Sequence, residues 1–203
     1  MQSLGTLKPK LIPRPEHELF YPEGSDEVTY KILKRIGRGT FSTVFLVECI
    51  ADGQLYAMKA HFEAPSIEVQ KRAVILNDAS TIGKVQGHPN IIKMKEVYSR
   101  GKIVAVSDGQ SQIKEVFAIM VLETIRGGEL YYHIRKCSGF SLGVSNLFFQ
   151  QLTGALIHMH NSGYCHRDLK PWNIMMSSDL SSVKIIDFGY ATPLDPAELA
   201  KSS

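Results

Sequence analysis

Hydrophobic and polar residues alternate along three consecutive segments in the first half of the chain. The segments are residues 28–36, 43–51 and 54–61. Alternation with a period of two is typical of a strand that buries one face. Turn residues separate the segments: Gly37 and Gly39 after the first, Asp52 and Gly53 after the second. The pattern therefore predicts three consecutive antiparallel strands.

The pattern changes along the rest of the chain. It predicts a helix over residues 66–86, strands over 91–98 and 116–123, a long polar surface loop over 99–114, and helices over 128–136 and 141–162. Four prolines among mixed charges break any periodicity before residue 28, so residues 1–27 are predicted to be an extended N-terminal arm. Strands come first and helices second, which predicts an α+β fold. We expect a β-sheet lobe with one helix over residues 28–123 and a mainly helical lobe over 124–203.

Composition narrows the function classes. The chain has 203 residues, 44% hydrophobic and 21% charged, as expected for an ordinary globular protein. The net charge of +3 is not concentrated in a basic block, so we expect neither nucleic acid nor membrane as a partner, while a small anionic ligand stays possible. The three cysteines are far apart, which favours a reducing compartment over a disulfide framework or a zinc site.

No segment of the sequence predicts secretion or membrane insertion. The first ten residues lack the long apolar stretch of a signal peptide. The most apolar run, residues 116–122, is too short to cross a bilayer and ends at Glu123. It is predicted to be a buried strand, and we expect a cytoplasmic protein.

Gly37 and Gly39 form a candidate phosphate-binding turn. Backbone without side chains can approach a phosphate closely and offer its N–H groups. The signal is weak alone, because an ordinary hairpin turn would use the same residues. The third glycine of the pattern G-x-G-x-x-G is replaced by Ser42, and a strand rather than a helix follows, which excludes a Rossmann site.

Lys59 and Asp78 are a candidate ion pair. Lys59 lies on the predicted apolar face of the third strand, where an ammonium needs an anionic partner. Asp78 falls on the apolar stripe that Ile75 and Ile82 form on the following helix. A direct pair explains both positions. The alternatives are a lysine that reaches solvent at the end of the strand and an aspartate at the wet edge of the stripe.

The stretch "YCHRDLKPWNIMM" carries a candidate catalytic group. Asp168 could accept a proton from a hydroxyl nucleophile, Lys170 could neutralise a phosphoryl oxygen, and Asn173 could supply an oxygen to a divalent cation. Asp187, after a later apolar strand, could hold the same metal. Each residue alone is more often an ordinary loop residue, but the four together match the needs of one phosphoryl-transfer reaction.

The sequence resembles the eukaryotic protein kinases over residues 30–191. The family's motifs occur in order as "GRGTFSTV", "AMK", "GHPNII", "GGEL", "HRDLKPWN" and "DFG". The texture of several motifs is most similar to the calcium/calmodulin-dependent kinase group, and Lys170 indicates serine/threonine substrates. Aminoglycoside-type phosphotransferases share a similar Asp and Asn but lack the "RDLKP" context. The resemblance implies a two-lobe kinase fold, ATP and Mg²⁺ as cofactors, and protein substrates with Ser or Thr.

The resemblance also implies a role for each motif residue. The nucleotide contacts would be Gly37, Gly39 and Ser42 over the phosphates, Lys59 on the α- and β-phosphates beside Asp78, Val44 and Ala57 above the adenine and Met175 below it, Leu122 as gatekeeper, the backbone of Glu123 and Ile125 at the adenine edge, and Glu129 at the ribose or a basic substrate residue. The catalytic contacts would be Asp168 as base, Lys170 on the γ-phosphate, and Asn173 with Asp187 as Mg²⁺ ligands. An apolar column of Ile82, Met94, His166 and Phe188 would link the lobes.

Several departures from the family pattern bear on activity. Asp78 stands where the family has Glu and is shorter by one C–C bond, roughly 1.5 Å. Trp172 stands where relatives that prefer basic substrates carry Glu. The sequence stops soon after the DFG motif, so we expect a truncated catalytic domain whose long helix 141–162 lacks packing partners. Two hypotheses follow: a serine/threonine kinase, or an inactive kinase-like nucleotide-binding fragment with a partner that covers the incomplete lobe.

Overall fold

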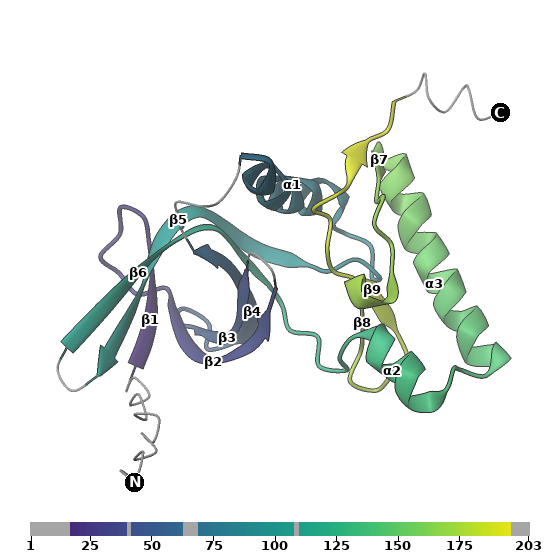
Figure 1. Cartoon of the computed structure of the whole chain (residues 1–203), viewed down its shortest axis with the longest axis horizontal. Coiled ribbons are helices and arrows are strands. Elements are labelled where there is room, and N and C mark those ends of the chain that lie inside the picture. The colour runs from purple at the N-terminus through teal and green to yellow at the C-terminus, as the bar shows by residue number, and fades with distance from the viewer. Residues whose placement is uncertain (1–16, 40–41, 63–68, 108–109, 196–203) are drawn as a thin grey trace, which may run out of the picture.

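A β-barrel with one helix packed beside it is followed by a mainly helical part (Figure 1). The computed structural model describes residues 17–39, 42–62, 69–107 and 110–195. The barrel contains six antiparallel strands in the order β1-β2-β3-β4-β6-β5. They are β1 (His17–Pro22), β2 (Tyr30–Arg38), β3 (Thr43–Cys49), β4 (Leu55–Phe62), β5 (Met94–Ser107) and β6 (Gln110–Glu123). The three strands predicted from alternation are confirmed as β2, β3 and β4.

The barrel is closed by a strand that the sequence pattern did not predict. Within the expected N-terminal arm, residues 17–22 form β1, which pairs with β2 on one side and with β5 on the other. Phe20 is fully buried in the barrel core, where its ring lies edge-on to Tyr98. Residues 1–16 lie outside the described part of the chain. The prolines suppressed the period-two signal, although Pro22 sits where β1 ends and needs no further ladder bond.

The predicted surface loop over residues 99–114 is wrong. β5 and β6 continue through most of it as a long hairpin, with Lys102 opposite Glu115 and Val106 opposite Ser111. On the β5 side, Ile103 and Ala105 are buried in alternation with partly exposed residues, which is the strand pattern. The β6 residues before Val116 are exposed, and their polarity resembled that of a loop.

β4 separates two hydrophobic clusters because successive side chains point to opposite faces. Met58 and Ala60 face the barrel core, whereas Ala57 belongs to a second cluster between the barrel and the helical part. The second cluster is completed by α1 (Val69–Val85), through Ile82 and Val85. Lys59 therefore faces α1, as the strand parity predicted.

The helical part carries the segments around the catalytic motifs. It contains α2 (Leu130–Cys137), α3 (Leu142–Asn161), β7 (Tyr164–Cys165), the 3-10 turn η1 (Pro171–Asn173), β8 (Ile174–Met176), β9 (Val183–Ile185) and β10 (Thr192–Pro193). Both predicted helices are thus confirmed, and so is the α+β, two-lobe fold class. Ser141 begins α3, where its hydroxyl accepts a hydrogen bond from the Val144 N–H at 3.4 Å.

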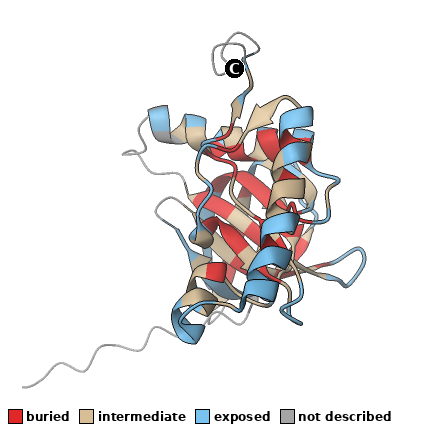
Figure 2. Cartoon of the chain, turned by 90° about the vertical axis from the view of Figure 1, so that its right-hand side faces the viewer, coloured by how far each residue is buried: buried red, intermediate tan, exposed pale blue. Residues whose placement is uncertain are grey.

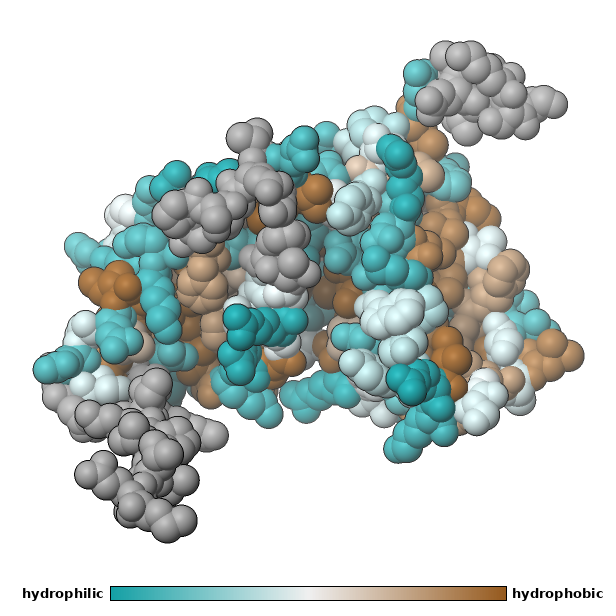
Figure 3. All heavy atoms as spheres, in the orientation of Figure 1, coloured by the Kyte–Doolittle hydropathy of each residue, from teal (hydrophilic) through white to brown (hydrophobic). Residues whose placement is uncertain are grey.

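One side of α3 faces solvent (Figure 2). Figure 3 shows hydrophobic residues gathered at the side of the molecule where α3 lies. On α3, Leu142, Phe149 and Ile157 are all more than half exposed. Among the described residues no helix is both long and apolar enough to span a bilayer.

We expect His61 to make the stability of the barrel pH-dependent. Its ring is 2% exposed, and Nδ1 donates to the Ala118 carbonyl at 3.0 Å. Burial, helped by the charge of Lys59, lowers the pKa of His61 from 6.5 to about 4. A lowered pKa stabilises the fold above pH 6.5, and this contribution is lost as the pH falls toward 4. We expect the free energy of unfolding to fall by about 3 kcal/mol across this interval.

Urea unfolding of the wild type and His61→Gln between pH 7 and 4 tests this prediction. The glutamine side chain can donate to Ala118 but does not titrate, so its curve should be flatter. His160→Gln removes an exposed imidazole from α3 and should leave the wild-type slope unchanged. Equal slopes for the wild type and His61→Gln would show that His61 is not the group responsible.

Candidate active site

Asp168 lies in a short loop between β7 and η1. Pro171 begins the 3-10 turn, and the Asn173 N–H donates to the Lys170 carbonyl at 2.9 Å. Arg167, directly before Asp168, has a φ of 63°. Such a left-handed residue and a proline-initiated turn hold the loop in one conformation. This turn brings the side chains of Asp168, Lys170 and Asn173 together without a regular helix.

The Asp168 carboxylate is contacted by both polar partners that the sequence suggested. Lys170 Nζ lies 2.6 Å from Asp168 Oδ2, and Asn173 Nδ2 lies 2.9 Å from the same oxygen. Asn173 also donates to the Asp168 carbonyl at 2.9 Å. The Asp168 side chain is 28% exposed. The carboxylate is therefore fixed in direction yet reachable by a hydroxyl group.

Lys59 and Asp78 form a direct ion pair between β4 and α1. Lys59 Nζ lies 2.5 Å from Asp78 Oδ2, and Asp78 is only 2% exposed. The other carboxylate oxygen accepts a hydrogen bond from the Phe188 N–H at 2.9 Å. The shorter acid thus still reaches both Lys59 and the backbone of the segment after Asp187. The predicted pair is confirmed.

The charges around this pair are unbalanced. Burial raises the pKa of Asp78, Lys59 opposes this shift, and the Asp187 carboxylate adds to it. Burial would lower the pKa of Lys59, but the carboxylates of Asp78 and Asp187 outweigh burial and raise it. Lys59 is thus a charged ammonium with two acids beside it.

Asp187 and Asn173 offer the oxygen ligands that Mg²⁺ prefers. The Ile186 N–H donates to the Asn173 carbonyl at 3.0 Å, which brings the two segments together. The Gly189 N–H donates to Asp187 Oδ1 at 3.1 Å. Across the described residues there is no cluster of three acidic, Cys or His side chains that could hold a metal alone. One carboxylate and one carboxamide fit a Mg²⁺ ion whose remaining ligands are phosphate oxygens and water.

The predicted adenine contacts gather beside the second hydrophobic cluster. Ala57 and Leu122 are opposite each other on β4 and β6, and both belong to this cluster. Val44 and Ile125 pack against it. Glu129 and Met175 meet at an isolated β-bridge. Leu122 is buried, and the Glu123 N–H donates to the Lys93 carbonyl at 2.9 Å.

The glycine turn connects β2 and β3. Gly37 lies opposite Val44, and the Gly39 N–H donates to the Ser42 carbonyl at 2.9 Å. Val44 in turn lies opposite Lys59, so the base of the turn and the ion pair share one part of the sheet. Residues 40 and 41, at the tip of the turn, lie outside the described residues.

Other contacts at the site were not predicted from the sequence. Trp172 stacks on Tyr131 with ring centroids 4.0 Å apart. Glu123 lies in the hinge, residues 123–126, which connects β6 to the helical part. Its Oε1 forms an ion pair with Lys184 Nζ at 2.6 Å. Asn77, next to Asp78 on α1, contacts the segment after Asp187. No local pattern marks these residues, because each contact joins segments far apart in the chain.

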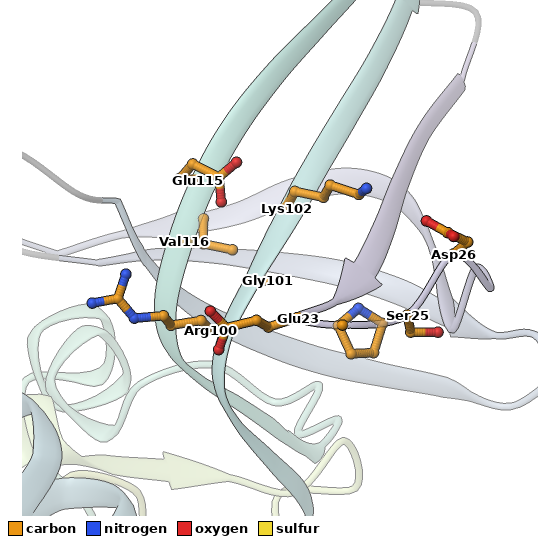
Figure 4. Close-up of a pocket in the computed structure, with 10 residues that line it drawn as sticks. Glu23, Ser25, Asp26, Arg100, Gly101, Lys102, Glu115 and Val116 are labelled. Atoms are coloured by element: carbon orange, nitrogen blue, oxygen red, sulfur yellow. The ribbon is translucent and has the colours of Figure 1, made fainter.

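Two pockets lie near the barrel and the hinge. The larger, of about 640 Å³, sits at the end of β1 and holds none of the predicted site residues (Figure 4). Its charged lining residues are Glu23, Asp26, Arg100, Lys102 and Glu115. The smaller, of about 460 Å³, is lined by the hinge residues 123–126 and by residues of the β8–β9 hairpin. Neither of these two pockets is lined by Lys59 or Asp168.

Gly127 allows the hinge to lie directly on β8. Its N–H donates to the Met176 carbonyl at 3.0 Å, and a Cβ would meet the Ser177 carbonyl oxygen at 2.1 Å. We expect Gly127→Ala to destabilise the chain by about 2 kcal/mol, since backbone must move to relieve the overlap. Thermal unfolding measures this loss. Gly143→Ala on α3, where a Cβ meets nothing, should not lower stability, and equal losses for both would contradict the packing argument.

Comparison with known proteins gives one consistent result. The sequence matches the protein kinase domain over residues 30–203. It is 34% identical to the serine/threonine-protein kinase SRK2C of Arabidopsis thaliana, over 80% of this chain and 42% of that protein. It is 32% identical to the putative ribosomal protein S6 kinase alpha-2 of Caenorhabditis elegans, over 77% of this chain and 18% of that protein.

A third relative comes from Mus musculus. The identity to sperm motility kinase 3A of Mus musculus is 33%, over 83% of this chain and 30% of that protein. The chain spans less than half the length of these three relatives. The family match covers all the motifs and the paired side chains described above, from the glycine turn to the DFG segment. The chain therefore belongs to the protein kinase domain family.

Proposed function

We propose that this protein is a serine/threonine kinase that transfers the γ-phosphate of ATP to Ser and Thr hydroxyls of protein substrates. The observation that carries the proposal is the Asp168 carboxylate held by Lys170 and Asn173 at 2.6 and 2.9 Å. A fixed, partly exposed carboxylate suits the acceptance of a proton from a substrate hydroxyl. The name of the Arabidopsis thaliana relative, a serine/threonine-protein kinase, supports serine and threonine as acceptors.

The remaining residues supply position and charge. Lys59, held by Asp78, would bind the α- and β-phosphates, and Lys170 would contact the phosphate being transferred. Mg²⁺, when bound, would neutralise charge that develops on the phosphate oxygens. Asp187 and Asn173 would hold it through their oxygens. The backbone of Glu123 and Ile125 would bind the adenine edge, under the roof of Val44 and Ala57 and above Met175.

Transfer of labelled γ-phosphate from Mg-ATP to a peptide library tests this proposal. Three otherwise identical libraries would carry Ser/Thr, Tyr or Ala at the acceptor position. We expect label in the Ser/Thr library alone, and none when EDTA replaces Mg²⁺. Label in the Tyr library would contradict the acceptor class, and no label in any library would contradict the transferase function of the chain.

A further inference from the structure

Asn77 on α1 connects the helix to the segment that follows Asp187. Its side-chain nitrogen Nδ2 lies 2.7 Å from the Ala191 carbonyl oxygen, 3.0 Å from that of Gly189 and 3.3 Å from that of Phe188. More than one hundred residues separate Asn77 from these partners in the sequence. Three backbone carbonyls therefore converge on one side-chain amide.

The chemistry of this contact requires a hydrogen-bond donor. The carboxamide nitrogen carries two N–H groups, which the three carbonyl oxygens share. The opposite amide orientation would place an oxygen against three oxygens and make no hydrogen bond. The Phe188 carbonyl also accepts from the Ala191 N–H at 3.0 Å. A side chain of similar size without N–H groups would therefore remove the Asn77 donor chiefly from the carbonyls of Gly189 and Ala191.

Two neighbouring side chains of α1 thus bind the backbone of the same segment, one through an N–H group and the other through carbonyl oxygens. Asp78 accepts from the Phe188 N–H at 2.9 Å, while Asn77 donates to the carbonyls of residues 188, 189 and 191. The helix also approaches closely, since a Cβ on Gly189 would overlap Val74. Asp187 stands directly before this segment, and its Oδ1 accepts a hydrogen bond from the Gly189 N–H within it at 3.1 Å.

We propose that Asn77 is a positioning residue, which orients the Asp187 carboxylate toward Mg²⁺ by holding the backbone of residues 188–191 against α1. The inference rests on the proposed function, because it assigns Asn77 a role in metal-dependent ATP binding. Asp78 couples the same segment to Lys59, so one turn of α1 sets both the metal ligand and the lysine that meets the phosphates. This role depends on the N–H groups of the Asn77 side chain, so a side chain that only fills the same space cannot perform it.

The test compares ATP affinity with Mg²⁺ and with EDTA, measured by calorimetry on the full chain. The variant Asn77→Leu is close in size and lacks donors, whereas Asn77→Gln keeps the amide. We expect Asn77→Leu to reduce the affinity gain from Mg²⁺ about tenfold, as the loss of one or two hydrogen bonds implies, and to leave the affinity in EDTA within about twofold. Asn77→Gln should retain more of the gain than Asn77→Leu.

The matched control is Gln70→Leu, the same loss of an amide at an exposed position of α1. It should keep the full gain from Mg²⁺. Hydrogen exchange of peptides spanning residues 186–194, measured without nucleotide, should be faster in Asn77→Leu than in the wild type and in Gln70→Leu. This second readout tests the contact independently of any ligand.

The outcomes separate the inference from the proposed function. If the wild type binds ATP no better with Mg²⁺ than with EDTA, the metal-dependent function itself fails. If the wild type shows the gain and Asp187→Asn loses it, but Asn77→Leu keeps it, the function stands and the inference is overturned. A lower melting temperature of Asn77→Leu with an unchanged Mg²⁺ gain would also overturn it, because the role would then be structural only.

Discussion

Asp168→Asn should reduce the rate of phosphoryl transfer about 10³-fold, the range expected for removal of a general base. The carboxamide is nearly isosteric but cannot accept the proton of the attacking hydroxyl. The side chain is 28% exposed, and asparagine keeps one oxygen to accept from Lys170 and Asn173, so the fold should be little affected. Affinity for Mg-ATP should stay within about threefold of the wild type, since Asp168 acts on the acceptor hydroxyl.

Initial rates of labelled phosphate transfer at saturating ATP measure this effect. Asp26→Asn is the matched control, because it makes the same exchange at an exposed position near the end of β1 and should keep the full rate. If Asp168→Asn transferred phosphate at more than a tenth of the wild-type rate, Asp168 would not be the base.

Lys59→Met should destabilise the chain by about 3–5 kcal/mol, because it leaves the Asp78 carboxylate buried without its partner. Asp78 is 2% exposed, and Lys59 Nζ is 2.5 Å away. The same variant should also lose most of its ATP affinity, since the proposed phosphate ligand is gone. Urea unfolding at pH 7 gives the stability, and Lys34→Met, on the exposed side of β2, is the control.

The double variant Lys59→Met/Asp78→Leu separates the two causes. Replacing both partners removes the uncompensated charge, so stability should recover by about 2 kcal/mol or more relative to Lys59→Met, although the Phe188 N–H loses its acceptor. ATP affinity should not recover. A double variant less stable than Lys59→Met would show that the buried charge is not the source of the loss.

The sequence could predict the features that depend on local periodicity. The parity of β4 placed Lys59 on the face opposite Met58, and the helical spacing placed Asp78 on the stripe of Ile75 and Ile82. The period of two in β4 and the helical period in α1 thus independently placed Lys59 and Asp78 at the interface between these two elements. The catalytic stretch was equally local, since Asp168, Lys170 and Asn173 lie within one turn.

Features that depend on pairing between distant segments could not be predicted in this way. β1 is a strand because β2 and β5 hold it on both sides, and neither partner is visible in residues 17–22 alone. The first half of β6 could not be recognised as a strand, because residues 110–115 pair with β5 but are polar and face solvent. In the sequence Asn77 is an ordinary polar residue of a helix. Its role depends on a contact with the segment after Asp187, which only the folded structure brings beside it.

Modification of Lys59 by a reactive ATP analogue tests whether ATP binds with its phosphates at Lys59. An acyl phosphate of ATP transfers its acyl group to a nearby lysine amine, and mass spectrometry identifies the residue. We predict acylation of Lys59 and of Lys170 at most, prevented by excess Mg-ATP and strongly reduced for Lys59 in Asp78→Leu. Labelling spread over exposed lysines such as Lys34, or unaffected by ATP, would contradict the proposed site.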